Sequence, residues 1–223
     1  MKKITIFLLL TTATISQSFA QKDAEARAIL NKVSQKYHAY NIIKSDFSFD
    51  IEDQQSHIEQ TQQGTLIVQA KTNKYKLILY DQGSNTSVGQ EMISNGTDQW
   101  TYLAKDKEVQ LNKADNGDEG FNPAKIFTIY EKGYKYIYTG DETLKGHVCQ
   151  VIDLTPEGDK EFFKIRLWID KAKKEIYSAL IFDKNGGRFT YTIHSFTPDA
   201  QVPEIAFTYN SKEHPGVEVV DLR

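Results

Sequence analysis

The fold is decided by the stretch EMISNGTDQWTY, which spans residues 91–102. Its centre is Asn95-Gly96, a dipeptide that strongly favours the tight turn of a β-hairpin. Short runs with apolar and aromatic residues flank this turn on both sides, as hairpin strands do. The stretch therefore predicts two antiparallel strands, residues 91–94 and 99–102.

Outward from this hairpin the same pattern recurs along most of the chain. Short apolar-rich runs alternate with turns that carry Gly, Asn, Asp or Pro, the residues that turns prefer. Strands at this spacing predict a mainly β chain with an antiparallel sheet, curled into a sandwich or a barrel. The further predicted strands are residues 47–51, 64–68, 74–80, 134–139, 148–154, 162–169, 176–182, 189–196, 205–209 and 217–220.

Two helices interrupt the strands. Residues 23–40 carry apolar side chains at helical spacing, with Asp23 as a possible N-cap. Residues 124–132 form the second predicted helix, with Asn122 as N-cap and Pro123 at the first position. A short apolar helix in an all-β chain must cover something, so we expect it over an open end of the sheet or a cavity. The predicted inner face of the first helix consists of Ala26, Ile29, Leu30, Val33, Tyr37 and Tyr40.

The first twenty residues are typical of a secretory signal peptide. Lys2 and Lys3 precede an apolar run, and Ser18-Phe19-Ala20 supplies the small residues of a cleavage site. The run is too short for a membrane span, although an uncleaved anchor is the alternative. We therefore expect residues 1–20 to be removed and residues 21–223 to form a single domain. Cys149, the one cysteine, lies in an apparent strand, where a buried inert thiol is expected.

Several function classes find no support in the sequence. The net charge of −3 does not suggest a nucleic-acid partner, which calls for a concentrated basic face. The five histidines are scattered, with no pair at metal-ligand spacing. Nucleophile-elbow, phosphate-loop and dinucleotide motifs do not occur. The sequence predicts a protein that is not an enzyme, without catalytic residues, bound metal or cofactor.

Aromatic content is the more informative feature, with 12 Phe, 12 Tyr and 2 Trp. Many lie in strands whose alternate residues are also partly apolar, as in residues 162–169. One interpretation is a sheet that is packed on both faces. The other is a barrel whose interior leaves a cavity for a ligand. Composition alone does not separate the two.

An ordered series of local strings resembles the periplasmic outer-membrane lipoprotein carrier family, the LolA type. The resemblance covers essentially the whole chain after residue 20, from the first helix onward. Its strings are Asp46-Phe47-Ser48-Phe49, Gly64-Thr65-Leu66-Ile67-Val68, Asn73-Lys74-Tyr75-Lys76-Leu77, the hairpin at residues 93–102, Asn122-Pro123-Ala124-Lys125-Ile126-Phe127, Leu154-Thr155-Pro156 and residues 163–169.

This resemblance implies an incomplete antiparallel β-barrel, or half-barrel, with an N-terminal helix and a short helical lid over a hydrophobic cavity. It implies a periplasmic chaperone that binds the acyl chains of lipoproteins and carries them from the inner to the outer membrane. The implied partners are acylated lipoproteins, an inner-membrane ABC transporter of the lipoprotein-sorting system and an outer-membrane acceptor. No nucleic acid is expected, and the chain is expected to act as a monomer.

On such a fold, alternation predicts which strand residues face an acyl-binding cavity. They are Phe47, Phe49, Leu66, Val68, Tyr75, Leu77, Leu79, Trp100, Tyr102, Phe163, Ile165 and Leu167. From the lid, Ile126, Phe127, Ile129 and Tyr130 are expected to face them. Family members latch the lid partly through an arginine, and Lys71 is the nearest basic residue here, beside Thr72 in place of the usual proline. For each cavity residue the alternative is ordinary core packing.

Three functions stay open at this point. The lipoprotein carrier comes first. The second is a binding module of related fold that senses lipids or lipoproteins in envelope-stress regulation, or a carrier of another acylated lipid. The third is an exported enzyme whose site is assembled from distant residues.

Overall fold

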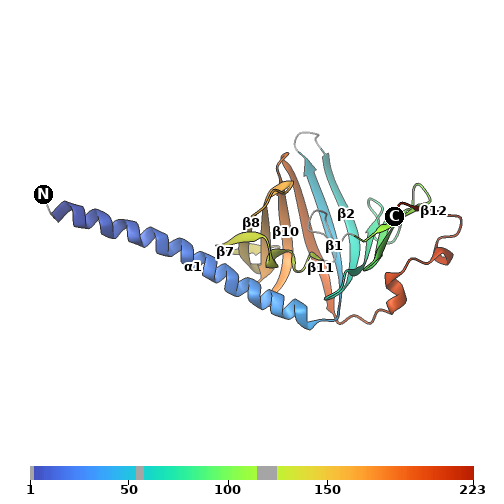
Figure 1. Cartoon of the computed structure of the whole chain (residues 1–223), viewed down its shortest axis with the longest axis horizontal. Helices are drawn as coiled ribbons and strands as arrows, with labels where there is room; N and C mark the ends of the chain where they lie inside the picture. The colour runs from blue at the N-terminus through green and yellow to red at the C-terminus, as the bar shows by residue number, and fades with distance from the viewer. Residues whose placement is uncertain (1–2, 54–57, 115–124) are drawn as a thin grey trace.

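The computed structural model describes residues 3–53, 58–114 and 125–223, with side chains from residue 21 onward. In this part of the chain twelve strands form one sheet, and a long helix, α1 (Lys3–Ala39), precedes them (Figure 1). The strands are β1 (Ile42–Asp53), β2 (Ile58–Gln69), β3 (Lys74–Tyr80), β4 (Val88–Asn95), β5 (Asp98–Leu103), β6 (Glu108–Lys113), β7 (Tyr134–Leu144), β8 (His147–Pro156), β9 (Phe162–Asp170), β10 (Glu175–Asp183), β11 (Gly187–Pro198) and β12 (Glu218–Asp221).

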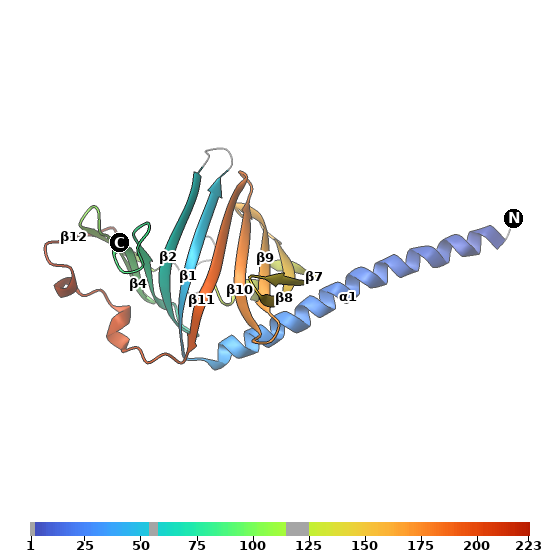
Figure 2. The same cartoon turned by 180° about the vertical axis from the view of Figure 1, so that it is seen from behind.

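The order of strands across the sheet is β12-β6-β5-β4-β3-β2-β1-β11-β10-β9-β8-β7. Neighbours are antiparallel, except that β12 pairs with β6 in parallel. Within the described residues β12 and β7 are the two edges, so the sheet curls without closing (Figures 1 and 2). The predicted mainly β half-barrel with an N-terminal helix is confirmed.

The hairpin predicted at residues 91–102 is formed by β4, β5 and the turn between them. Asn95 accepts hydrogen bonds at its Oδ1 from the N–H groups of Thr97 and Asp98, at 2.9 and 2.8 Å. Gly96 has φ +91°, a conformation that suits a residue without Cβ. The turn predicted from the Asn-Gly dipeptide is confirmed.

Helix α1 runs beside β7 and covers part of the sheet (Figures 1 and 2). Its second half is the helix that the sequence predicts, and Ala26, Ile29, Leu30, Val33 and Tyr37 are buried as expected. The Tyr37 hydroxyl accepts the backbone N–H of Ile176 at 2.8 Å, which ties the helix to β10. Residues 3–20 continue the same helix. Over the described residues, no helix is long and apolar enough to cross a membrane.

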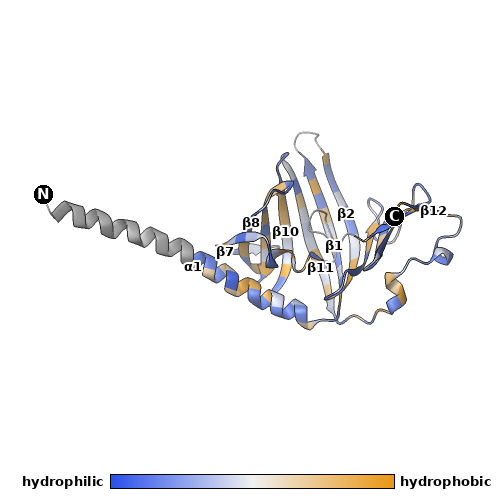
Figure 3. Ribbon diagram, viewed as in Figure 1, coloured by the Kyte–Doolittle hydropathy of each residue, from blue (hydrophilic) through white to orange (hydrophobic). Residues whose placement is uncertain are grey.

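The two faces of the sheet differ in what covers them. Apolar residues alternate with polar ones along the strands, as the bands in Figure 3 show. We call the face that carries Phe47, Leu66 and Tyr75 the inner face, because these residues belong to the main apolar core together with the α1 residues. We call the opposite face the outer face.

We call residues 204–223 the C-terminal strap: its first part packs on the outer face of β3–β5, and its last part joins the sheet as the edge strand beside β6. It contains two short 3-10 helices, Glu204–Phe207 and Ser211–Glu213, and ends in β12. The strand predicted at residues 205–209 is therefore wrong. Phe207 is only 1% exposed, and its 3-10 helix packs against β3 and β4. Strand β6, which pairs with β12, was not predicted from the sequence, because its apolar residues are few.

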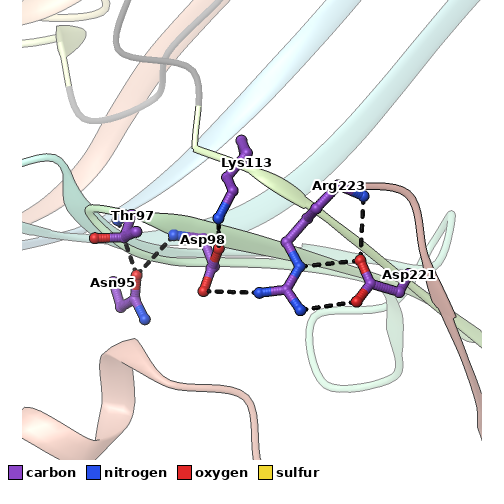
Figure 4. A network of polar contacts seen from close by, with 6 residues as sticks. All are labelled: Asn95, Thr97, Asp98, Lys113, Asp221 and Arg223. Atoms are coloured by element: carbon purple, nitrogen blue, oxygen red, sulfur yellow. Dashed lines mark hydrogen bonds and ion pairs between the residues drawn. The ribbon is translucent and has the colours of Figure 1, made fainter.

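A polar network fixes the end of the strap. The Arg223 guanidinium donates to both carboxylate oxygens of Asp221 and also reaches Asp98 at the start of β5, at 3.3 Å (Figure 4). Lys113 contacts the same Asp98 carboxylate from β6 at 3.2 Å. The strap is thus held by both a backbone ladder and side-chain ion pairs.

Candidate functional site

The inner face is a continuous apolar surface that spans the middle of the sheet. Cross-strand rows bring residues from separate segments together, such as Ile43, Val68 and Tyr75, or Leu66 and Leu77. Because strands alternate their side chains, the apolar residues of this surface occupy alternate positions of β1, β2 and β3. The Phe47 ring lies over Gly64, where an added Cβ would come within 2.5 Å of it. Its other side contacts Tyr191, with ring centroids 4.5 Å apart.

Residues 125–131, which we call the cover segment, lie on this face. The segment consists of turns and a short 3-10 helix, Ile129–Glu131, where the sequence predicts an α-helical lid. Its predicted start at residues 122–124 lies outside the described residues. Phe127 is 2% exposed and packs against Tyr37 and Phe196, with ring centroids 5.1 and 5.8 Å away. Thus the predicted position of the lid agrees with the structure, while its predicted helical form does not.

All four predicted lid residues pack against the inner face. Phe127 and Tyr130 are buried, and Ile126 and Ile129 are partly buried against the core. Among the described residues the hydroxyl of Tyr130 finds no hydrogen-bond partner, and burial raises the pKa of this phenol well above its usual value. The contacts between the cover segment and the inner face are therefore almost all apolar.

The cover segment leaves little room beneath it. The space between Ile126, Phe127 and Ile129 on one side and β9–β11 on the other is a wholly apolar void of about 10 Å³. That is at most the room for one water molecule. The predicted cavity is thus filled by the side chains of the cover segment, since apolar interiors pack to high density.

A larger pocket of about 270 Å³ lies at the edge of the cover segment. Its walls come from the end of α1, the β2–β3 turn and the start of the cover segment. Tyr37, Val68 and Phe127 form part of an apolar floor that continues into the core. Lys71, the predicted latch residue, lines this pocket together with Lys125, which places it near the cover segment.

The polar contacts that hold the cover segment to α1 centre on Glu131. Its Oε1 accepts a hydrogen bond from the Ser34 hydroxyl at 2.5 Å and lies 2.8 Å from Nε2 of His38. We call these three residues the Glu131 latch. No sequence signal points to it, because Ser34 and His38 are more than ninety positions away in the chain.

The structure brings most of the predicted cavity residues together. They are Phe47, Phe49, Leu66, Val68, Tyr75, Leu77, Leu79, Ile165 and Leu167, all within the core cluster or packed against it. The sequence did not single out Tyr191, Ile193 and Ile181, which line the void under the cover segment. The sequence predicts strands at these positions, but no local pattern showed which face of the sheet their side chains occupy.

Trp100 and Tyr102 lie on the outer face, contrary to the expectation. The hydroxyl of Tyr75 donates to Oε1 of Gln99 at 2.7 Å, so Gln99 shares the inner face. Its neighbour Trp100 must then point outward, and so must Tyr102. The Tyr102 ring contacts His214 of the C-terminal strap, with centroids 4.2 Å apart. Tyr102 thus belongs to the layer between sheet and strap.

Phe163 is also placed differently from the expectation, since it is 50% exposed. The pairing of β9 with β10 skips this residue: Lys164 pairs with Phe182, and Phe162 pairs with Asp183. Such an irregularity interrupts the alternation of faces. As a result Phe162, and not Phe163, packs against the core.

Reactive groups are sparse in the described part of the chain. Cys149 is buried, and burial raises the pKa of its thiol to about 11, which keeps it protonated and unreactive at neutral pH. Among the described residues no group of three or more His, Cys, Asp or Glu side chains is placed to hold a metal ion. The feature with functional potential is therefore the covered apolar face and the pocket at its edge.

Comparisons with known proteins place the chain in a family and show what its fold is similar to. A family model described as "Uncharacterized protein" matches residues 72–195, more than half of the chain, and the chain belongs to that family. No curated protein matches the sequence.

Solved structures are similar at low identity. An uncharacterized conserved protein from Thermus thermophilus is 12% identical, with 88% of this chain and 99% of that chain covered and a TM-score of 0.59. MucB is 14% identical over 84% of this chain and 64% of its own, with a TM-score of 0.50. A LolA superfamily protein from Nitrosomonas europaea is 13% identical over 82% of this chain and 97% of its own, with a TM-score of 0.44. The likeness to the Thermus thermophilus protein and to MucB is one of fold.

Proposed function

We propose that this chain is a periplasmic carrier that binds the acyl chains of lipoproteins on its inner face, in place of the cover segment. The observation that carries the proposal is how the cover segment is held. Among the described residues, its backbone hydrogen bonds are local: Thr128 N–H donates to the Lys125 carbonyl, and Glu131 N–H donates to the Thr128 carbonyl. The segment can therefore leave the sheet without breaking a ladder.

The free energy of apolar burial is similar for the cover segment and for an acyl chain that would replace it. Full burial of one large apolar side chain contributes about 1.5–3 kcal/mol. The four apolar residues of the cover segment together represent on the order of 5–10 kcal/mol of this kind. A long acyl chain, at about 0.8 kcal/mol per methylene, represents on the order of 10 kcal/mol. Because these two burial free energies are close, an acyl chain that replaces the cover segment binds with moderate net affinity and can be released.

Moderate affinity is what a carrier between two membranes needs. A ligand can shift the cover segment only by its differential affinity for the uncovered face. Covering the face when cargo leaves also keeps a large apolar surface from water, where it would promote aggregation. In this account residues 21–223 form the exported domain after removal of residues 1–20, and the chain has no catalytic role.

The proposed partners follow from the family resemblance in the sequence. An inner-membrane ABC transporter would load the acylated lipoprotein, and an outer-membrane acceptor would receive it. The carrier is proposed to act as a monomer.

A binding experiment tests the proposal. The mature chain is titrated with a dipalmitoylated peptide and with the same peptide without acyl chains, and complexes are counted by native mass spectrometry. We expect a one-to-one complex with the acylated peptide alone. The same measurement on protein purified from its native periplasm is expected to show a co-purifying acylated species. Absence of binding in both experiments would contradict the proposal, while recovery of a membrane signalling partner would favour the sensing module instead.

A further inference from the structure

Two hydroxyl groups on the inner face of the sheet are buried without a hydrogen-bond partner. They belong to Ser45 of β1, which is 0% exposed, and to Tyr191 of β11, which is 7% exposed. Among the described residues neither oxygen makes a hydrogen bond. A buried polar group without a partner costs free energy, so most such groups in folded proteins are paired. These two groups therefore have hydrogen-bonding capacity that a ligand could use.

The two hydroxyls are neighbours beneath the cover segment. Tyr191 lines the void under this segment, and its ring packs against that of Phe47, with centroids 4.5 Å apart. Ser45 precedes Phe47 by two positions on β1 and pairs with Phe196 of β11. The Phe196 ring in turn contacts Phe127 of the cover segment, with centroids 5.8 Å apart. Burial raises the pKa of the Tyr191 phenol well above its usual value, and the nearby Ser45 hydroxyl opposes this shift.

Other buried hydroxyls in this part of the sheet do have partners. The Tyr37 hydroxyl accepts a backbone N–H of β10 at 2.8 Å, and the Ser178 hydroxyl donates to the backbone carbonyl of Tyr191 at 2.9 Å. Tyr130 carries a third unpaired hydroxyl, but it belongs to the cover segment and would leave with it. Of the described residues, Ser45 and Tyr191 are thus the ones that keep an unpaired hydroxyl on the inner face after the segment leaves.

We propose that Ser45 and Tyr191 donate hydrogen bonds to a carbonyl oxygen of the bound ligand, at the ester or amide that ends its acyl chain. The inference rests on the proposed function and names a chemical feature of its ligand. A carbonyl oxygen has two lone pairs, and serine and tyrosine hydroxyls can each donate to one of them. Both residues belong to the sheet, so they stay in place when the cover segment is displaced.

Such a site would make the inner face selective for acyl groups. A plain hydrocarbon chain buries the same apolar surface but leaves both hydroxyls unpaired, as the cover segment does. An acyl ester or amide has the same apolar chain and also supplies the missing acceptor. One neutral hydrogen bond contributes a net free energy that corresponds to about 2–10-fold in affinity.

The test compares two lipopeptides that differ only in their carbonyl groups. One carries a glyceryl group with two palmitoyl esters, and the other carries two hexadecyl ethers in their place. Titration followed by native mass spectrometry measures both affinities. We expect the native chain to bind the ester about 2–10-fold more tightly than the ether. Tyr191→Phe and Ser45→Ala should each weaken binding of the ester, leave binding of the ether unchanged and so reduce this preference.

Tyr209→Phe is the matched control. The Tyr209 hydroxyl is likewise buried without a partner among the described residues, but it lies in the C-terminal strap, where its ring stacks on His214 at 5.5 Å. Its removal should change neither affinity. The urea midpoint of Tyr191→Phe should not fall, because the lost hydroxyl makes no hydrogen bond in the ligand-free chain.

Two results would overturn the inference while leaving the carrier function intact. One is equal affinity of the native chain for the ester and the ether. The other is an equal loss for both lipopeptides in Tyr191→Phe, which would indicate a role in packing alone. If the native chain binds neither lipopeptide, the proposed function fails together with the carbonyl site.

Discussion

Two segments of this chain cover the two faces of one sheet, and they are attached in different ways. The cover segment lies on the inner face by side-chain burial, with its polar contacts concentrated on Glu131. The C-terminal strap lies on the outer face and adds a backbone ladder, because β12 pairs with β6. Ion pairs from Lys74 to Glu204 and from Arg223 to Asp98 fix the strap further.

A buried carboxylate beneath the strap adds to the difference between the two covering segments. Glu91 is buried on the outer face, between Lys76 Nζ at 2.6 Å and His214 Nε2 at 3.3 Å. Removing His214 with the strap would expose this site and leave Glu91 with one fewer partner. Detaching the strap therefore breaks a hydrogen-bonded ladder and a charge cluster, whereas detaching the cover segment exposes mainly apolar surface. The difference indicates that the strap is a permanent part of the fold and the cover segment is the exchangeable one.

The largest expected effect is a difference in stability between alanine variants of two equally buried phenylalanines, one in each covering segment. Phe207 of the strap is 1% exposed and Phe127 of the cover segment is 2% exposed. Phe207→Ala should lower the free energy of unfolding by about 3–5 kcal/mol, the usual cost of truncating a buried phenylalanine. Phe127→Ala should cost clearly less, because its segment can leave the sheet without unfolding the rest. Urea denaturation of both variants measures the two values, and an equal loss would remove the distinction between the covers.

The same two variants are expected to differ in their affinity for an acylated ligand. Phe127→Ala removes about 1.5–3 kcal/mol of burial that competes with an acyl chain. The affinity for a palmitoylated peptide should therefore rise by at least about tenfold. Phe207→Ala should leave this affinity unchanged, because the residue lies on the other face. Weaker binding by Phe127→Ala would mean that the segment forms part of the binding surface and does not compete with the ligand.

These comparisons also show what the sequence could reveal. Turn residues and short apolar runs predicted nearly all strands, because such signals are local. The face of a side chain was predictable where the strands are regular, as at Leu66, Val68 and Leu77. It was not predictable at Phe163, where the pairing skips a residue. Nor was it predictable at Tyr102, because the strap covers this aromatic residue on the outer face of β5.

The polar attachment of the cover segment was beyond sequence reasoning for a related reason. Lys71 was chosen by resemblance, and the structure places it at the pocket next to the cover segment. The observed latch joins Glu131 to Ser34 and His38, which only the packing of α1 brings close. Contacts between residues so far apart carry no periodicity and no motif.

A smaller effect is expected from the latch itself. Glu131→Gln removes the charge of the shared acceptor, and one partly exposed contact of this kind contributes about 0.2–1 kcal/mol. The affinity for the palmitoylated peptide should rise by about 1.5–5-fold. Glu204→Gln, which alters an ion pair of the strap, is the control and should not change binding. A fall in affinity for Glu131→Gln would contradict the role of this contact in holding the segment closed.

The smallest effect concerns acid. Hydrogen bonds from the Arg223 side chain and backbone hold the pKa of Asp221 at about 2, below its ordinary value of 3.8. Partial desolvation opposes ionisation of Asp98, but hydrogen bonds from Lys113 and Arg223 still lower its pKa. Carboxylates with lowered pKa values stabilise the folded state above the ordinary pKa, and this contribution is lost as pH falls from about 3.8 towards 2.

Hydrogen exchange at residues 218–222 should therefore quicken below pH 3.8, after correction for the intrinsic rate at each pH. Asp221→Asn should show the faster exchange already at neutral pH. Unchanged protection of β12 down to pH 2 would show that the ladder with β6 suffices without the ion pairs.

The most direct test is to cross-link the cover segment to α1 and measure acyl-peptide binding. Ser34→Cys and Glu131→Cys place two thiols where a hydrogen bond joins the native side chains, and a short thiol-to-thiol cross-linker connects them. Cys149 should not react, since burial raises the pKa of its thiol to about 11. Binding of a dipalmitoylated peptide is then compared before and after cross-linking. We expect the variant to bind the peptide before cross-linking and not after it. Equal binding in both states would contradict the exchange of the cover segment for an acyl chain.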